Sequence, residues 1–578
     1  MVKTVKMLVR RINKAGEYLL FVACAVIFFC PLALAAADTQ PQALGTVGIY
    51  ALREIDPTLT GNGVRVGVIA RSLTYLDNSS LNDYQPNVDH RCFSHLDYEL
   101  LDDHLLTPTL SPHSTAVCSI LFGEDANAYT DEIGAFEYLG AIPRAHASVY
   151  ELQHFLKEGA IDSISDLDVI TISWGWDIED WWTRFFEALA EHSGIPVVAS
   201  IGNGENAFHR PLYPGASSNV IGVGVVDSVV TEDLQTTMAY FGLAKPEHSS
   251  CGPTDDGRSK PDLVAPGNCL VAGIEDVNAY KLTGNWSSFA APVVSGVVGM
   301  LVQKAGQDPN LALVVSPQGG DLVIKALLMT SATKLPYWHK GDLGKEDDQR
   351  VPLDNIQGAG MVNAVGAYQD LIAGRQEPGT VTSRGWDLNL LDTEIPARIY
   401  EFDVNEPNQT ITATVTWHRH YEASGEFSRL DDRSTDLRLE LWAVDSGQTG
   451  ADVLVDVSDS QVDNIEHIHS QTLAGYVRYQ LVVLLNHEEA KDNDIQERYA
   501  LSWNADSSEK KDSIFWPDLN TDGIVDVNDY QFLVDNFTAR HPSGRYFVGD
   551  VNTDGRIDGD DLKVLLKELH RRATWYHP

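Results

Sequence analysis

The chain of 578 residues is poor in basic side chains and in cysteine. It has 42 Lys and Arg against 82 Asp and Glu, a formal net charge of −40. Because phosphate contacts need clustered basic side chains, this balance excludes a nucleic-acid-binding protein. No stretch after residue 37 is apolar for long enough to be expected to span a membrane. A hydrophobic content of 43% and 12 Trp exclude a disordered chain, so we expect several domains with hydrophobic cores.

The first 37 residues differ from the rest, since they carry five basic groups and a single acid. Residues 18–37 have no charge and form an apolar run that ends in Pro31 and an alanine-rich segment. A basic start, an apolar middle and a small-residue end predict a secretory signal peptide over residues 1–37. The alternative is an uncleaved membrane anchor. Either way we expect a secreted or extracytoplasmic protein, with the cell surface as one location.

Removal of this segment leaves four of the 6 cysteines, Cys92, Cys118, Cys251 and Cys269. An even number in an exported protein allows one or two disulfides, whose pairing the sequence does not give. Cys118 lies in an apolar run, where a buried thiol is the alternative.

Two patterns divide the remaining chain. Residues 38–375 alternate helix-like segments with short apolar runs, at residues 64–69, 169–172, 195–199, 220–225 and 263–265. This predicts an α/β domain with a mostly parallel sheet covered on both faces. Residues 376–508 contain strand-like runs separated by turns, and predict a β-sandwich with one buried face per sheet. Under that pattern, the adjacent Glu466 and His467 are expected at the surface.

Residues 509–578 contain a repeated acidic motif, with the two copies offset by 32 positions. Each copy supplies oxygen ligands in the spacing of a calcium loop, including a backbone carbonyl at position 7, and an apolar-patterned helix follows it. The predicted ligands are Asp518, Asn520, Asp522, Ile524, Asp526 and Asp529 in the first copy and Asp550, Asn552, Asp554, Arg556, Asp558 and Asp561 in the second. Two solvated acidic turns are the alternative, but the identical spacing favours calcium.

Four segments of the α/β domain have residue types suited to acyl transfer. His113 follows Ser111-Pro112 at a predicted helix start, and Ser288 lies at a predicted loop-to-helix junction. Asn203 lies between two glycines after a buried strand, where its amide can donate to a developing oxyanion. Ser173, Trp174 and Gly175 close another strand, whose edge suits an extended peptide. Taken singly, each residue also fits a structural role such as a helix cap or a turn.

The order of these segments resembles the subtilisin-like serine proteases, or subtilases, over roughly residues 61–370. The first core strand at residues 63–69, a Gly-x-x-Pro-x-Ala turn at 140–145 and the closing segments at 325–329 and 358–364 all match, and residues 249–267 are the most specific stretch. The resemblance implies that His113 is the general base, Ser288 the nucleophile and Asn203 an oxyanion donor beside the Ser288 amide. It implies a secreted serine endopeptidase with a protein or peptide substrate.

One element of the family pattern is missing. The triad aspartate at the end of the first core strand falls on Ala70 or Arg71. Without a carboxylate the imidazole loses its orienting partner, and we expect the neighbouring Arg71 to disfavour protonated His113. A carboxylate from the following loop, Asp77, Asp83 or Asp89, is a candidate replacement. The alternative function is therefore a catalytically impaired pseudo-protease that binds peptides or acts as a scaffold. Trp286, just before the nucleophile, adds bulk that we expect to crowd the oxyanion side.

The C-terminal repeat resembles a type I dockerin, which has two calcium loops each followed by one helix. The resemblance implies calcium as the cofactor and a cohesin-type or surface scaffold as the partner. A calcium-stabilised cap within the chain is the alternative.

Overall fold

The computed structural model describes residues 39–71, 81–103, 107–131, 133–158, 164, 166–204, 210–226, 249–335, 338, 340–341, 349–404, 409–430, 435–445, 447, 450–486, 496–507, 525–535, 559–567 and 569–570. The predicted signal peptide at residues 1–37 lies outside these ranges.

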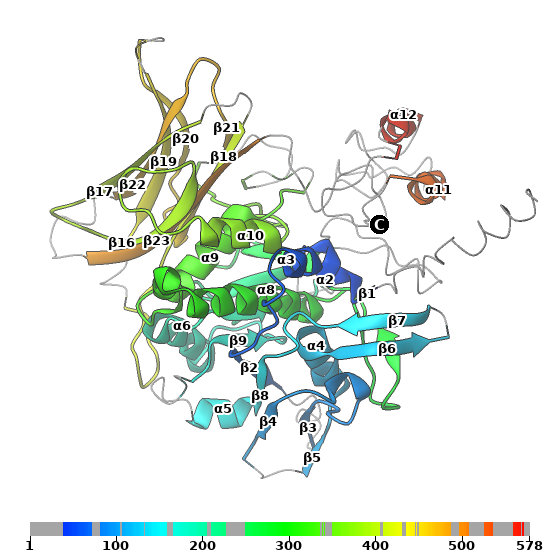
Figure 1. Ribbon diagram of the computed structural model, residues 1–578. Coiled ribbons are helices and arrows are strands. Elements are labelled where there is room, and N and C mark those ends of the chain that lie inside the picture. The colour runs from blue at the N-terminus through cyan, green and yellow to red at the C-terminus, as the bar shows by residue number, and fades with distance from the viewer. Residues whose placement is uncertain are drawn as a thin grey trace, which may run out of the picture.

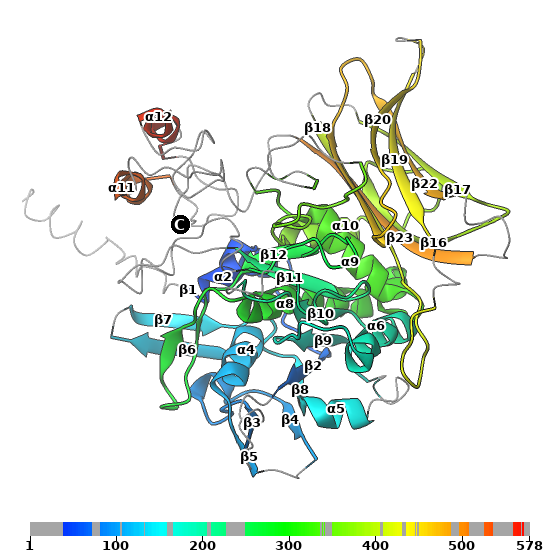
Figure 2. The same ribbon diagram turned by 180° about the vertical axis from the view of Figure 1, so that it is seen from behind.

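A seven-stranded parallel sheet forms the centre of the first domain (Figure 2). Its order is β12 (Leu263–Pro266), β11 (Ile221–Val226), β10 (Val197–Ser200), β9 (Val169–Ile172), β2 (Arg65–Ala70), β8 (His146–Glu151) and β4 (Tyr98–Leu101). Every pair in this sheet is parallel, and strands β9 to β12 are buried along their whole length. The apolar runs that predicted a mostly parallel sheet therefore form one.

Helices cover both faces of this sheet, as predicted. On one face Val66, Val68 and Ala70 share a core with α4 (Pro112–Phe122) and α8 (Ser287–Gln307). On the other face, Ile69 shares a core with α6 (Trp181–Ser193), beside α5 (Leu152–Glu158). Successive residues of β2 thus point to opposite faces, which puts the side chain of Ala70 on the α4 side.

Smaller elements complete the domain. The helices are α2 (Gln42–Thr46), α3 (Ile49–Ile55), α9 (Gly320–Ser331) and α10 (Ala364–Ile372), with 3₁₀ turns at Arg91–Phe93 and Pro309–Val315. The short sheets are β1 (Thr39–Gln40) with β7 (Gly134–Leu139) and β6 (Glu124–Thr130), β3 (Leu81–Gln85) with β5 (Thr107–Leu110), and β13 (Leu270–Ala272) with β14 (Tyr280–Leu282).

Helix α8 corrects one expectation from the sequence. Among the described residues it is a helix long and apolar enough to cross a membrane, and 83% of its apolar window is buried inside the protein. A bent pair, Pro309–Val315 with Gly320–Ser331, passes the same test when the two are taken together. In α8 this composition reflects its position in the core, between α4 and the sheet (Figure 1).

The cysteines after residue 38 form no disulfide with one another. Cys92, Cys118 and Cys269 are buried, and burial raises the pKa of the Cys118 thiol to about 12. At neutral pH these thiols are therefore protonated, which agrees with the buried-thiol alternative and not with the disulfide one.

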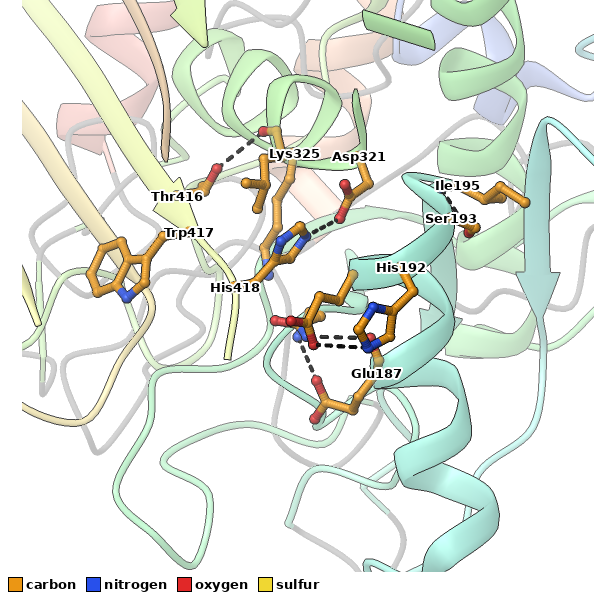
Figure 3. A network of polar contacts seen from close by, with 12 residues as sticks. Glu187, His192, Ser193, Ile195, Asp321, Lys325, Thr416, Trp417 and His418 are labelled. Carbon is orange, nitrogen blue, oxygen red and sulfur yellow. Dashed lines mark hydrogen bonds and ion pairs between the residues drawn. The ribbon is translucent and has the colours of Figure 1, made fainter. Parts of the chain in front are cut away.

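Two further sheets follow α10 and share one core (Figure 1). Their strands are β15 (Gly379–Thr380), β17 (Ala397–Asp403), β22 (Arg478–Leu485), β19 (Leu437–Val444) and β20 (Val453–Ser458) in one sheet and β16 (Arg384–Asp392), β23 (Gln496–Ser507), β18 (Gln409–Trp417) and β21 (Ile465–Gln471) in the other. The second sheet also packs its outer face on α9: the Thr330 hydroxyl donates to Thr414 Oγ1 at 2.9 Å, and Thr416 Oγ1 donates to the Leu322 carbonyl at 3.0 Å (Figure 3).

The surface expectation for Glu466 and His467 is wrong. Both side chains are fully buried. His467 lies on the outer face, where its ring bonds Lys334 Nζ at 2.9 Å and Thr414 Oγ1 at 2.8 Å. Glu466 accepts from the Ser460 amide at 2.7 Å and from the Ser458 hydroxyl, and burial raises the pKa of its carboxyl group. Strand alternation shows two faces but cannot show that a separate helix covers the second one.

Histidines connect the two domains at this junction. His418 Nε2 lies 2.7 Å from Asp321 Oδ2 of α9 (Figure 3). His420 lies between two carboxylates, at 2.7 Å from Glu191 of α6 and 3.0 Å from Glu497 of β23. Burial by itself would lower the pKa of His420, but the hydrogen bonds to these carboxylates raise it to about 10. His420 is therefore charged at neutral pH and joins the domains by a two-sided ion pair.

The stability from this ion pair is expected to depend on pH. Since the folded pKa of His420 is above the unfolded value of about 6.5, its contribution is complete below that pH and is lost as pH rises toward about 10. We expect the wild type to melt about 2–4 °C above the His420→Gln variant at pH 6, with the difference shrinking toward zero by pH 10. Thermal unfolding from pH 6 to pH 10 measures this difference in melting temperature. The control is the His95→Gln variant, because the ring of His95 bonds the Pro143 carbonyl. A pH-independent difference for His420→Gln would contradict the ion pair.

Candidate active site

His113 lies in the first turn of α4. Ser111 caps this helix by accepting from the Ser114 amide at 3.2 Å, and Pro112 occupies the first helical position, as expected at a helix start. The His113 ring contacts the Phe289 ring of α8, with 5.6 Å between the centroids. The N-terminal turns of α4 and α8 therefore meet beside the sheet.

Ser288 is the second residue of α8, at the loop-to-helix junction predicted from the sequence. Its hydroxyl donates to the Ser173 carbonyl at 2.9 Å. The first amides of a helix lack partners within the helix and carry the positive end of its dipole, so a negative charge that develops next to Ser288 is stabilised. This is a suitable place for a nucleophile whose reaction produces an oxyanion.

Asn203 is held next to Ser288, the predicted nucleophile. Gly202 and Gly204 on either side have φ angles of 111° and 70°, which glycine adopts without strain. Asn203 Oδ1 accepts from both the backbone N–H and the hydroxyl of Ser287, each at 2.9 Å. These two bonds fix the carboxamide, and among the described residues its Nδ2 donates to no protein group. That amide is therefore available as a donor beside Ser288.

The predicted peptide edge lies beside the same serine. Ser173 is buried, and apart from its carbonyl contact with Ser288 its own Oγ has no hydrogen-bond partner in the described part of the chain. Trp174 Nε1 donates to the Ile69 carbonyl at 2.8 Å, and Gly175 fits against Leu212, where a Cβ would come within 2.6 Å of the leucine Cβ. The edge ends at Trp176, because its N–H and C=O both pair with the backbone of Tyr213.

Burial controls the charge of His113. It lowers the pKa of the ring to about 4, while the negative charge of Asp83 acts in the opposite direction. The ring is therefore neutral at pH 7 and can accept a proton. Arg71, which we expected to lower this pKa, does not contribute to the shift; its guanidinium lies over the Trp176 ring, 4.8 Å from the centroid.

Ala70, one of the two positions where the sequence predicted the loss of the triad carboxylate, places a methyl group in the core. Ala70 is 6% exposed and its side chain lies on the α4 face, the face that also carries His113. Its register partner on β8 is Glu151. Glu151 is already used elsewhere, because it accepts from the Gln153 and His154 amides at 2.8 and 3.1 Å at the start of α5, and burial raises its pKa. These two bonds make Glu151 a cap for α5.

Of the three carboxylates considered as replacements, Asp83 is the one whose charge acts on His113. It is half-buried on β3, a strand tied to α4 because the Ser111 amide donates to the Gln85 carbonyl at 2.7 Å. A second hydrogen bond joins the segment after β3 to α4, because the Asn87 amide donates to Thr115 Oγ1 at 2.8 Å. Asp89 is exposed, and Asp77 lies outside the described residues.

Trp286 is 40% exposed at the start of α8. Its indole lies on Gly284, where a Cβ would be 1.7 Å from the indole Nε1. The described contact of the ring is thus with the preceding loop, and crowding of the oxyanion side remains a prediction.

The most specific sequence stretch, residues 249–267, contains a buried ion cluster that sequence reasoning missed. Asp262 lies 2.5 Å from Lys260 Nζ and 3.2 Å from Lys325 Nζ, and it accepts from the Gly222 amide at 2.6 Å. Burial lowers the pKa of Lys260 to about 7. Charged residues on either side of Pro261, directly before the apolar strand β12, are the signal that could have identified it. The cluster fixes β11 against β12, and the argument for the site does not depend on it.

Most of the predicted calcium ligands cannot be placed. Asp518, Asn520, Asp522, Ile524, Asp550, Asn552, Asp554, Arg556 and Asp558 lie outside the described residues. Asp526, Asp529 and Asp561 lie within them, beside or in α11 (Val527–Asp535) and α12 (Gly559–Lys567). The Asp561 side chain is fully buried in the first turn of α12, where an inward carboxylate fits a cation ligand. The described residues contain no group of three or more His, Cys, Asp or Glu placed to hold a metal ion.

Comparison with known proteins identifies the family. Serine protease AprX of Bacillus subtilis is 31% identical over 219 residues, which cover 34% of this chain and 42% of AprX. The C5a peptidase of Streptococcus pyogenes is 36% identical over 117 residues, or 20% of this chain and 9% of that protein. The chain therefore covers less than half the length of either relative. Fervidolysin from Fervidobacterium pennivorans, a solved keratinolytic enzyme related to subtilisin, aligns over 74% of this chain and 53% of its own, at 17% identity and a TM-score of 0.39.

The family assignment comes from the first domain. The subtilase family matches residues 61–360, more than half of the 578 residues, and this range contains His113, Asn203 and Ser288. The chain belongs to the subtilase family.

Proposed function

We propose that the protein is an exported serine endopeptidase that forms an acyl-enzyme on Ser288. The observation that supports this is the convergence of three groups: the Ser288 hydroxyl at the start of α8, the fixed Asn203 amide beside it, and a neutral His113 in the facing helix turn. A structural role would explain each group by itself but does not require all three together.

In this reaction Ser288 Oγ attacks the peptide carbonyl carbon and His113 takes the hydroxyl proton. The carbonyl oxygen becomes an oxyanion, which the Ser288 amide and Asn203 Nδ2 stabilise by donating hydrogen bonds. His113 then gives its proton to the leaving amine, and the C–N bond breaks. Water then attacks the ester carbonyl carbon and gives a proton to His113. The bond between this carbon and Ser288 Oγ breaks, and His113 returns the proton to Ser288 Oγ. Before attack, Ser288 Oγ must leave its resting bond to the Ser173 carbonyl.

Asp83 is proposed as the carboxylate that supports this reaction in place of the missing aspartate. Its charge favours the imidazolium that forms in the transition state, and the ties between β3 and α4 hold its strand beside the helix. It is a positioning residue rather than a full replacement, because burial still dominates the pKa of His113. In a related subtilisin, loss of the triad aspartate lowers turnover by about 3 × 10⁴, so we expect a slow enzyme.

The Asp83→Asn variant tests this role. The acid limb of kcat/KM in the wild type is expected near the His113 pKa of about 4. Removing the negative charge is expected to move this limb to lower pH and to reduce kcat about three- to tenfold with KM nearly unchanged. Peptide hydrolysis from pH 3 to 9 measures both. Asp89→Asn, at an exposed position, is the matched control. An unchanged acid limb in Asp83→Asn would remove Asp83 from the mechanism.

A second candidate function is peptide binding without turnover. It is favoured by one observation, the methyl group of Ala70 on the α4 face where the family has its carboxylate. Casein hydrolysis by the folded chain, produced from residue 38 onward with calcium present, separates the two functions. Hydrolysis that requires both Ser288 and His113 supports the protease. The absence of hydrolysis by the folded chain supports the binding protein.

We also propose that the C-terminal repeat binds calcium and attaches the protein to a cohesin-type or surface scaffold partner. Its support is the identical ligand spacing of the two copies and the buried carboxylate of Asp561. Bound calcium would neutralise the acidic loops and order them; the catalytic steps above do not involve it.

A further inference from the structure

Arg71 carries a positive charge at the end of β2 that the reaction above does not use. It follows Ala70 directly at the end of β2 and is half-buried. Its guanidinium lies over the Trp176 ring at 4.8 Å, close enough for a cation–π interaction. Trp176 itself is 40% exposed. The stacked pair therefore borders solvent and is not closed inside the core.

Strand register places this pair at the same edge of the sheet as the nucleophile. Strands β2 and β9 are parallel neighbours, with Ile69 opposite Ile172. Arg71 and Trp176 follow these positions by a few residues, at the carboxyl ends of the two strands. Between them, Trp174 Nε1 donates to the Ile69 carbonyl and the Ser173 carbonyl accepts from Ser288 Oγ. The edge of the sheet that contacts Ser288 is therefore also the edge that carries Arg71.

Arg71 also has an unusual shortage of partners. Arg65 pairs with Glu99 at 2.9 Å, Arg91 with Asp125 at 3.1 Å and Arg258 with Asp256 at 2.8 Å. Among the described residues no carboxylate or carbonyl bonds to the guanidinium of Arg71. Burial lowers the pKa of Arg71, although a guanidinium stays protonated at neutral pH. Within the described residues, Arg71 therefore differs from these three arginines: its guanidinium lies on an aromatic ring at the carboxyl edge of the sheet and bonds to no carboxylate.

We propose that Arg71 and Trp176 form a subsite for an acidic side chain of the peptide substrate, so that the protein prefers Asp or Glu at one position near the scissile bond. This inference rests on the proposed function because its ligand is a peptide substrate. The contact between Arg71 and Trp176 does not depend on that function. The indole holds the guanidinium plane, and the N–H groups at the edge of that plane form a fork that fits a carboxylate. A carboxylate at position 70 would compete with the substrate for the Arg71 guanidinium. Alanine at this position leaves the guanidinium available to the substrate.

The first test is the cleavage of a mixed peptide pool, with every cleavage site identified by mass spectrometry. The wild type is expected to show Asp and Glu enriched about tenfold at one position, and Arg71→Gln to lose that enrichment. Arg71→Lys keeps the charge but not the fork, and an intermediate enrichment is expected. Arg65→Gln, at the opposite end of β2, is the matched control and should keep the wild-type preference. Hydrolysis without acidic enrichment would overturn the inference and leave the proposed function intact.

A second test does not require turnover. In Ser288→Ala, fluorescence polarisation compares labelled peptides that differ only in Glu, Gln or Lys at one position, with the position moved along the peptide. We expect one position where Glu binds about tenfold more tightly than Gln, and no such difference once Arg71→Gln is added. Equal binding of Glu and Gln peptides at every position would refute the subsite. If the wild type hydrolyses nothing, the proposed function fails while this comparison still decides the role of Arg71.

Discussion

The Ser288→Ala variant is expected to lose measurable hydrolysis of casein. In a related subtilisin, removing the whole triad lowers turnover about 2 × 10⁶-fold, and removing the aspartate alone lowers it about 3 × 10⁴-fold. The ratio of these losses is roughly 10², which is the further decrease in turnover expected here when Ser288 or His113 is removed. His113→Ala should therefore lose about as much as Ser288→Ala. The double variant should lose no more than either, because the base acts only through the nucleophile.

The measurement combines casein hydrolysis with labelling by a fluorophosphonate, which phosphonylates an activated serine with loss of fluoride. The label is located by mass spectrometry. Label on Ser288 is expected in the wild type and absent from Ser288→Ala. Ser331→Ala is the control, since this half-buried serine at the end of α9 bonds carbonyls of its own helix. Hydrolysis that survives in Ser288→Ala would sink the proposed mechanism, and a folded wild type with neither label nor hydrolysis would establish the peptide-binding alternative.

Much of the fold could be predicted because its signals are local. Fully apolar strands separated by helices specify a parallel sheet with both faces covered. The positions of His113 and Ser288 at helix starts follow from a serine and proline before one and a glycine-containing loop before the other. Such features need only neighbouring residues, and the structure confirms the sheet and both helices.

The errors come from contacts between segments far apart in the sequence. Arg71 was expected to act on His113 because it lies next to the missing aspartate, yet its side chain turns onto Trp176, more than a hundred residues later. The charge that does act comes from Asp83 on a separate small sheet. In the same way, the burial of Glu466 and His467 depends on their contacts with the segments around them. No pattern within one strand contains that information.

Restoring the aspartate in Ala70→Asp is expected to raise kcat by about 10²- to 10⁴-fold. The side chain of residue 70 already faces the helix that carries His113, so the new carboxylate would lie on the correct face to orient the ring and stabilise its charged form. The acid limb of kcat/KM should move upward from about 4, since a nearby negative charge raises the pKa of His113. Ala70→Asn is the matched control, because it has the same shape without the charge, and no such gain is expected.

Two neighbours set the size of this gain. Glu151, the register partner of residue 70, would place a second carboxylate close by, and repulsion between the two would raise the pKa values of both. Arg71 would act against that repulsion by pairing with the new aspartate. If so, the gain in turnover should come with a loss of preference for acidic substrates, because the guanidinium would then have a partner within the chain. A faster enzyme with its acidic preference intact would show that Arg71 and residue 70 are independent, and a folded Ala70→Asp variant with no gain over Ala70→Asn would show that the missing carboxylate is not what limits this site.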